Sequence, residues 1–394
     1  MSLKNETKET LESTKSFYRE YTDDMTRERF SRELHADTDR LMELYKDAIG
    51  SDVDEITGEP VPLHVKAGRL FKSLSMRLNP TRRIVFGVSL AGFALQFLYS
   101  GFFATALLTV SFAAMVMILL LELLEKLDVK QEMDLAKELQ VSLLPPSKAR
   151  LAGLDIHSFA NTAKDVGGDY VDLIETDEGL YYIIADVSGK GLSAALYMIR
   201  MQALVHLLIK KDKPTPKQLF IELNNYIKSY RSDKTFITAI AAFFPKNEDY
   251  FIHARAGHNP AILYSREKDI TVELQTTGFA LGMTKSARLD NFMKESRISF
   301  KEGDSVLFYT DGLTEARNEE GDEYGTSRIR SLMDIYGSLE SKSIVKKIQT
   351  SLEAFIGNTR TADDITFSVI CKEKSGVIAG SIGKAKKEQT LTDV

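Results

Sequence analysis

The sequence predicts an α+β protein: a sandwich of sheets and helices that follows a membrane hairpin. Residues after about 146 contain many apolar segments of strand length but only three long helical segments, so strands and helices do not alternate one for one. That pattern argues against a doubly wound parallel sheet. A run of 38 residues without a charge, Ile84 to Leu121, is long enough for two membrane spans. A composition of 43% hydrophobic and 27% charged residues is ordinary for a folded chain.

Residues 1–83 are expected to form a helical cytoplasmic segment. Apolar residues recur at near-helical spacing from about Asp24 to Ala48, and a loop with Gly and Pro follows from Ser51 to Pro62. A second helix is expected from about His64 to Leu78, with a basic face. Such a helix before a membrane span could lie on anionic lipid or pack on a neighbour, and the sequence leaves both open.

The uncharged run is too long for one straight span. A helix of that length would extend about 57 Å, whereas the hydrocarbon layer is about 30 Å thick and needs about 20 residues. We therefore predict a hairpin over 84–121, with spans at about 84–99 and 102–121 and a break at Tyr99-Ser100-Gly101. The alternative is a buried helical hairpin in a soluble domain, which would rarely lack a polar face over its whole length.

Basic residues flank the run on both sides and are missing from its central turn. Arg82 and Arg83 precede it, and Lys126 and Lys130 follow it. By the positive-inside rule both flanks are cytoplasmic. This predicts a two-span protein of the inner (cytoplasmic) membrane whose termini and main domain lie in the cytoplasm.

A helical connector is expected over 122–145, because no Pro or Gly occurs before Pro145. A heptad-like stripe runs along it, formed by Val129, Met133, Ala136, Gln140 and Leu143. This short stripe could pair two connectors in a homodimer, or the helix could pack on its own main domain. The main domain is expected at 146–372, and a flexible tail at 373–394.

Six strands and three long helices are expected in the main domain. The strands are Leu154–Phe159, Tyr181–Val187, Phe236–Phe244, Ala261–Tyr264, Ser305–Tyr309 and Ile365–Ile370. The helices are Leu192–Ile209, Pro216–Tyr230 and Ser341–Ile356. Several of these strands end or begin at an aspartate.

Five short motifs, four of them built on aspartate, lie between residues 166 and 366. They are VGGDY around Asp169, DVSGKG from Asp186, AGHNP around His258, TDGLTEA around Asp311 and ADDIT around Asp363. Carboxylate oxygens suit Mg²⁺ or Mn²⁺, and glycines let backbone and solvent approach an ion closely. Carboxylates that converge from strand ends repel one another and need cations to neutralise them. The motifs therefore predict a site for hard divalent cations.

The order and wording of these motifs resemble the PPM metal-dependent protein serine/threonine phosphatases, in particular the branch of the sporulation phosphatase SpoIIE and the stress-response phosphatases RsbU. The resemblance runs from about Met133 to Lys372 and includes ELQVSLLPP from Glu138 and GFALGM from Gly278. It implies two antiparallel sheets packed face to face, flanked by helices, with metals at one edge. It also implies that the connector helix relays upstream signals to the catalytic core.

The resemblance implies two divalent cations, Mn²⁺ or Mg²⁺, and a set of ligands. Asp186 matches the aspartate that bridges the ions, and Val187 matches the neighbouring backbone carbonyl ligand. Asp311 and Asp363 match ligands of the second ion, and Asp169 matches the acid of the first. Asp186 and Asp311 would act catalytically through metal-activated water. Asp364 matches a position that is usually not a ligand, and Glu315 is expected to be a helix-start acid rather than an outer ligand.

The sequence departs from the family pattern at two points. Ser188 stands where many eukaryotic members have a histidine proposed as proton donor, although the bacterial branch generally shares this difference. No phosphate-binding arginine precedes Asp169. Ser188 and Lys190 are the candidate substrate-binding residues. His258 is expected to be structural, bonding neighbouring loops.

Composition restricts the remaining possibilities. The net charge of −5 gives no general signal for nucleic-acid binding, and the single Cys371 fits a reducing compartment. By resemblance, the substrate is the phosphoserine or phosphothreonine of a regulatory protein, an anti-sigma-factor antagonist of STAS type in a bacterial partner-switching pathway. The alternatives are a non-catalytic pseudophosphatase that signals through the connector, and a phosphatase of a small phosphate ester.

Overall fold

The computed structural model describes residues 38, 42, 45–47, 61–98, 101–163, 166–229, 235–359 and 361–373. Contacts divide the chain into two compact units, Met1–Asp128 and Val129–Val394. Most of the helix predicted from Asp24 to Ala48 lies outside the described residues, and so does the predicted tail after Glu373.

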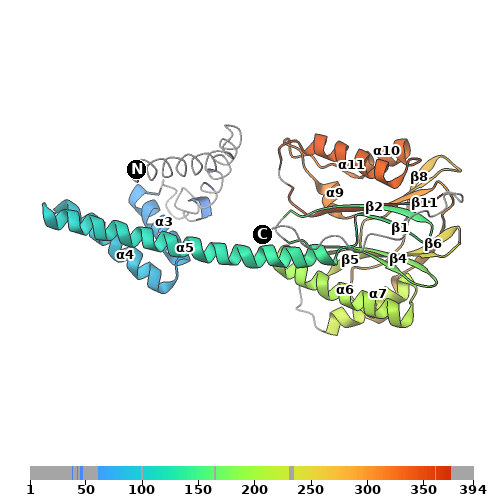
Figure 1. Cartoon of the computed structure of the whole chain (residues 1–394), viewed down its shortest axis with the longest axis horizontal. Helices are drawn as coiled ribbons and strands as arrows, with labels where there is room; N and C mark the ends of the chain where they lie inside the picture. The colour runs from blue at the N-terminus through green and yellow to red at the C-terminus, as the bar shows by residue number, and fades with distance from the viewer. Residues whose placement is uncertain are drawn as a thin grey trace, which may run out of the picture. The chain divides into compact units, whose positions relative to one another are not determined.

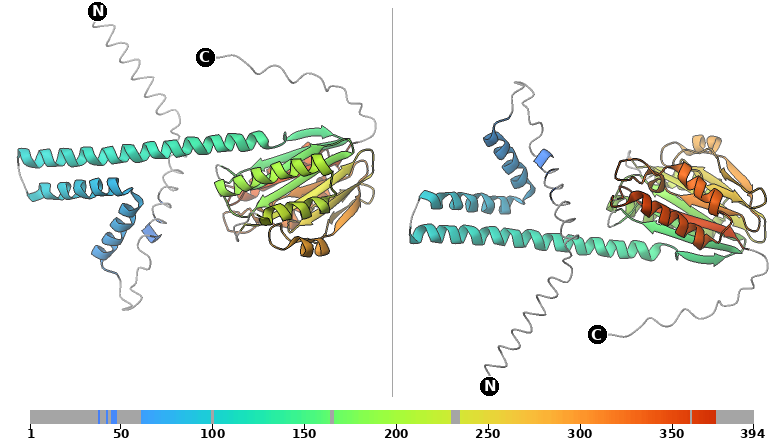
Figure 2. Two further views of the ribbon diagram at one scale, coloured as in Figure 1. Left: turned by 90° about the horizontal axis from the view of Figure 1, so that it is seen from below. Right: turned by 90° about the horizontal axis from the view of Figure 1, so that it is seen from above.

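The first unit contains a helical hairpin. Its elements are α3 (Leu63–Arg77), α4 (Pro80–Leu95), the short 3₁₀ helix η1 (Gln96–Leu98) and the first part of α5 (Phe102–Leu143). Figure 2 shows α4 running alongside α5. Arg82 joins the two helices, since its Nη1 donates to Glu122 Oε1 at 2.7 Å and to Glu125 Oε2 at 2.6 Å.

The break between the helices falls near the predicted turn, but the first helix differs from the predicted span at 84–99. It begins four residues earlier, at Pro80, whose fixed φ suits a first helical position, and it ends at Leu95. Its 16 residues are fewer than a single straight span needs. Among the described helices, α5 is long and apolar enough to cross a membrane, and α6 (Leu192–Asp212) passes the same test. Since α6 buries one face on a sheet, its apolar character belongs to the core.

The second unit contains two antiparallel sheets. The six-stranded sheet has the order β1-β2-β11-β10-β7-β8, and the five-stranded sheet has the order β3-β4-β5-β6-β9. The strands of the first sheet are β1 (Lys148–Leu151), β2 (Leu154–Asn161), β7 (Ile262–Ser265), β8 (Ile270–Glu273), β10 (Ser305–Tyr309) and β11 (Ile365–Lys372). Those of the second are β3 (Asp169–Glu175), β4 (Gly179–Val187), β5 (Ile237–Pro245), β6 (Tyr250–Ala256) and β9 (Glu295–Ser299).

Helices cover the outer face of each sheet, as Figure 1 shows. On one side lie α6 and α7 (Pro216–Ser229), and on the other lie α10 (Thr326–Tyr336) and α11 (Ser341–Ile356). Two short helices, α8 (Ser286–Phe292) and α9 (Asp311–Glu315), complete the unit. Three apolar layers hold it together: one between the sheets and one under each pair of helices. The α+β sandwich expected from the sequence is confirmed.

The topology brings the acidic segments to one edge of the sandwich. Because β3 and β4 are antiparallel, the start of β3 lies beside the end of β4, and Asp169 pairs with Asp186 in register. In the other sheet, the end of β10 lies beside the start of β11, and Thr310 N donates to Thr366 O. The Thr310 hydroxyl then donates to Asp169 Oδ2 at 3.0 Å, which joins the two edges.

Candidate active site

Asp186 and Asp169 occupy neighbouring strands at the site edge. Asp186 is the next-to-last residue of β4, a strand whose other residues are all buried. Asp169 is the first residue of β3 and is only 8% exposed. The sequence predicts no strand at Asp169, whereas the structure places it inside the sheet, where the Thr310 hydroxyl donates to its carboxylate.

Asp311 and Asp363 reach the same edge from the opposite sheet. Asp311 follows β10 and begins the short helix α9, while Asp363 lies two residues before β11. The backbone between them is tightly packed, because a Cβ on Gly312 would lie 2.0 Å from the carbonyl oxygen of Asp364. Only glycine permits this approach of the two loops.

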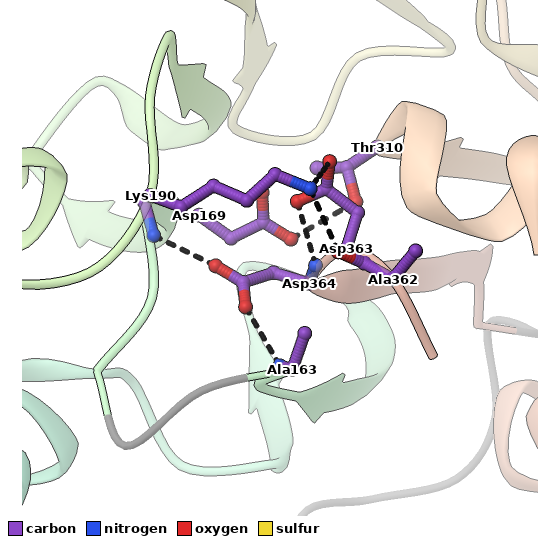
Figure 3. A network of polar contacts seen from close by, with 8 residues as sticks. Ala163, Asp169, Lys190, Thr310, Ala362, Asp363 and Asp364 are labelled. Atoms are coloured by element: carbon purple, nitrogen blue, oxygen red, sulfur yellow. Dashed lines mark hydrogen bonds and ion pairs between the residues drawn. The ribbon is translucent and has the colours of Figure 1, made fainter. Parts of the chain in front are cut away.

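Lys190 places a positive charge among these acids. Its Nζ lies 2.7 Å from Asp363 Oδ2 and donates to the carbonyl oxygen of Ala362, also at 2.7 Å. Figure 3 shows this contact next to the Asp169–Thr310 pair. The ion pair raises the pKa of Lys190, so the side chain is a cation at neutral pH.

The Asp364 carboxylate accepts hydrogen bonds from backbone N–H groups. Its Oδ1 accepts from Ala163 N at 2.8 Å and its Oδ2 accepts from Gly168 N at 2.7 Å (Figure 3). The carboxylate therefore ties the segment before β3 to the start of β11. This agrees with the expectation from the family pattern that Asp364 is not a ligand.

Gly168 leaves room for two oxygen-bearing groups to lie close to the backbone. A Cβ at this position would lie 2.9 Å from the carbonyl oxygen of Val187 and 3.4 Å from Asp186 Oδ1. The Asp186 carboxylate and the Val187 carbonyl thus face the same small space beside Gly168. These are the two groups expected to bind one ion together.

The carboxylates act on one another electrostatically. Burial, followed by the charges of Asp311, Asp363 and Asp364, raises the pKa of Asp186 to about 7. Burial raises the pKa of Asp169 well above its usual range, and burial with the charge of Asp363 raises that of Asp311. Each carboxylate is harder to ionise because the others are near, so the cluster favours a bound cation.

This donor set fits a hard divalent cation. It consists of carboxylate and carbonyl oxygens, with a glycine where an ion must approach the backbone. In the part of the chain that the structure describes, no group of three or more His, Cys, Asp or Glu side chains is arranged so that it could hold a metal ion. The chemistry of the donors therefore fits the ions, while the side chains would have to draw together around them.

Ser188 and Glu315, two residues singled out from the sequence, lie near the site. The Ser188 hydroxyl accepts from Phe236 N at 2.8 Å, and Ser188 N donates to Phe236 O at 2.9 Å, which anchors the loop after β4. Glu315 is the last residue of α9 and exposed, and burial together with the charge of Asp311 raises its pKa.

His258 is buried and lies behind the site. Its Nδ1 is 2.8 Å from the hydroxyl of Thr238, and Thr238 pairs in register with Asp186. Burial lowers the pKa of His258 to about 4, so the ring is neutral at physiological pH. These contacts agree with the structural role expected for His258.

Two supporting residues escape sequence reasoning. Thr310 carries no chemical signal beyond its position before Asp311, yet its hydroxyl orients Asp169. Gln140 belongs to the stripe for which the sequence leaves open pairing of two protomers or packing on the main domain; it is only 4% exposed and its side chain bonds to Gly167, as packing on the main domain requires. Its place in ELQVSLLPP, inside the region of family resemblance, was the available signal.

Comparisons with known proteins identify the family of this chain. The sequence profile of the family Stage II sporulation protein E (SpoIIE) matches residues 176–373. Phosphoserine phosphatase RsbU of Bacillus subtilis (strain 168) is 28% identical over 243 residues, covering 62% of this chain and 70% of the relative. Protein IcfG of Synechocystis sp. is 24% identical over 266 residues, but the match spans only 41% of IcfG.

A solved structure shares the fold. The SiaA-PP2C domain of Pseudomonas aeruginosa superimposes with a TM-score of 0.55 at 19% identity, covering 63% of this chain and 98% of that domain. The sandwich and its acidic edge thus agree with the match of the family profile to half of the chain. The chain belongs to the SpoIIE family, the SpoIIE/RsbU-like branch of the PPM protein phosphatases.

Proposed function

We propose that this protein is a membrane-anchored, metal-dependent protein serine/threonine phosphatase. The observation that carries the proposal is the convergence of four aspartates from two sheets on one edge, where burial and then neighbouring carboxylate charges raise the pKa values of Asp186 and Asp311. Family membership and the similarity to a phosphoserine phosphatase support the same reaction, hydrolysis of a phosphate ester on a protein side chain.

Two Mg²⁺ or Mn²⁺ ions, when bound, would supply a water of lowered pKa and positive charge for the phosphate oxygens. Asp186 and the carbonyl of Val187 would hold the shared position, with Asp169 on one side and Asp311 and Asp363 on the other. Thr310 keeps the Asp169 carboxylate oriented through its 3.0 Å hydrogen bond. Cys371 takes no part, because it is buried and burial raises the pKa of its thiol.

Lys190 is the candidate cation for the phosphate group of the substrate. Its ammonium already lies at the acidic edge, on a loop fixed by the Ser188–Phe236 hydrogen bonds. With Asp363 serving as a metal ligand, the Lys190 ammonium would be available to contact a phosphate oxygen. The Ser188 hydroxyl accepts one bond and keeps its own hydrogen to donate.

The substrate we propose is a phosphorylated regulatory protein of a partner-switching pathway, of the anti-sigma-factor antagonist type with a STAS fold. Similarity to RsbU supports this choice. Membrane attachment is supported by the uncharged run from Ile84 to Leu121 and by the apolar part of α5. Exposed apolar residues along α5, such as Leu135 and Leu139, would allow two connectors to pair in a homodimer.

The test is hydrolysis of a phosphoserine peptide by the full-length protein with Mn²⁺, compared with Asp186→Asn and Asp311→Asn. Each variant should lose more than about a hundredfold in rate, beyond the upper range for losing an outer-shell partner of a metal. Equal rates in wild type and variants would reject the site. A wild type that binds a phosphoprotein but never hydrolyses it would indicate a pseudophosphatase, and preference for small phosphate esters would reject the protein substrate.

A further inference from the structure

The Gln140 side chain pairs with a single backbone residue beside the site. Its Nε2 donates to the Gly167 carbonyl oxygen at 2.7 Å, and Gly167 N donates to its Oε1 at 3.1 Å. Gln140 lies near the end of α5 and is only 4% exposed. Both polar groups of a buried peptide residue are thus satisfied by one side-chain amide, as buried backbone groups require.

The residue that Gln140 holds leads directly into the acidic edge. Gly167 is followed by Gly168, whose N–H donates to Asp364 Oδ2 at 2.7 Å, and then by Asp169, the first residue of β3. A Cβ on Gly167 would lie 2.5 Å from Asp364 Oδ2, so the segment is close to Asp364 on one side and bonded to Gln140 through Gly167. These peptides lead directly into Asp169, whose carboxylate accepts from the Thr310 hydroxyl on its other side.

A cavity lies between the end of the connector helix and the start of β3. This cavity of about 400 Å³ lies against Gln140, and its lining includes Leu144, Pro145, Val171 and Asp169 itself. Side chains beside open space are not fixed by close contacts. Among the described residues of the connector helix, Gln140 supplies the hydrogen bonds to the segment that leads into Asp169.

We propose that Gln140 is a positioning residue for the ion that Asp169 would hold. This inference rests on the proposed function, and it assigns to the connector helix one side chain that aligns the segment 167–169. A residue that only docked the helix would affect stability. A positioning residue also affects the binding of one ion and leaves the other unchanged.

The experiment titrates the full-length protein with Mn²⁺ and follows free Mn²⁺ by electron paramagnetic resonance. The variant is Gln140→Leu, and its matched control is Gln131→Leu, the same exchange at an exposed position of the same helix. We expect Gln140→Leu to weaken one of two Mn²⁺ sites by about tenfold to a hundredfold, the range for lost outer-shell partners. The other site, and both sites of Gln131→Leu, should match wild type.

Two wild-type isotherms from a folded Gln140→Leu would overturn the proposal, even if its melting temperature fell. If Gln140→Leu does not fold, the same titration is made on Gln140→Asn, whose amide is one methylene too short to reach Gly167. Selective weakening of one Mn²⁺ site in Gln140→Asn supports the proposal. Unchanged Mn²⁺ binding in Gln140→Asn overturns it. A wild type that binds no Mn²⁺ would instead reject the proposed function, so the two failures are distinguishable.

Discussion

Asp186 is the residue on which the site depends. Burial and three neighbouring carboxylates raise its pKa to about 7, far above that of an aspartate in water. A carboxylate whose pKa is raised on folding contributes stability below its unfolded pKa of about 4, and this contribution is lost as pH rises through about 7. The metal-free protein therefore carries an electrostatic cost at neutral pH that a bound cation would remove.

Metal affinity should consequently depend on pH. Because the ligand must be deprotonated, Mn²⁺ affinity should rise by up to about tenfold per pH unit as pH rises and level off above about pH 7. Asp169 and Asp311 shift in the same direction and would add to the slope. Isothermal titration calorimetry between pH 5.5 and 8 measures this dependence, and a flat affinity over that range would contradict it.

The aspartates could be found from the sequence because each stands beside an apolar strand or in a glycine-containing motif. Their supporting residues could not. The role of Thr310 depends on two sheets meeting at one edge, which pairs it with a residue 141 positions away. That of Gln140 depends on the helix docking against a segment 27 positions further on, which no periodicity encodes.

At the scale of elements, the segment before β3 is closely packed against the site. Gly168 has the Val187 carbonyl and the Asp186 carboxylate as neighbours, and its own N–H is bonded to Asp364. Because β3 begins at Asp169, any shift of this segment moves a candidate ligand. The strand and the site are therefore built by the same contacts.

Replacing Gly168 with alanine should test that coupling. The added Cβ would lie 2.9 Å from the Val187 carbonyl oxygen, so backbone must shift, at a cost of about 1–3 kcal/mol typical of overpacking. Thermal unfolding should show the loss, and Mn²⁺ binding should weaken. Gly68→Ala is the control, since nothing lies within 4 Å of its Cβ in α3 and stability there should hold or rise. Unchanged stability and binding in Gly168→Ala would contradict the tight packing.

Long or strongly apolar elements were predictable, and short or half-exposed ones were not. The strand found from the run YYIIADV is β4, and the helices found at Leu192, Pro216 and Ser341 begin at those residues. The prediction missed the strands β1, β3, β6, β8 and β9 and the helices α8 and α10. These elements are held by sheet pairing and tertiary packing, which outweigh their local signals.

At the scale of the whole molecule, the chain joins a helical hairpin to a phosphatase unit through one continuous helix, α5. Many of its apolar side chains between Phe102 and Leu121 are exposed in the hairpin, which suits lipid better than water. At the open end of the hairpin, Arg82 of α4 pairs with Glu122 of α5.

Removing residues 84–121 should therefore change where the protein is found. The full-length chain should sediment with membranes, and the deletion should remain in the soluble fraction with its phosphatase unit folded. Ultracentrifugation with and without an alkaline carbonate wash measures this partition. Membrane sedimentation of the deletion after the wash would contradict the anchor.

The most direct test of the central claim is anomalous diffraction from crystals grown with Mn²⁺. Our account predicts two manganese peaks about 3.5–4 Å apart, both within coordination distance of Asp186, with Asp169 at one ion and Asp311 and Asp363 at the other. The absence of manganese at these aspartates, at concentrations that support hydrolysis, would contradict it.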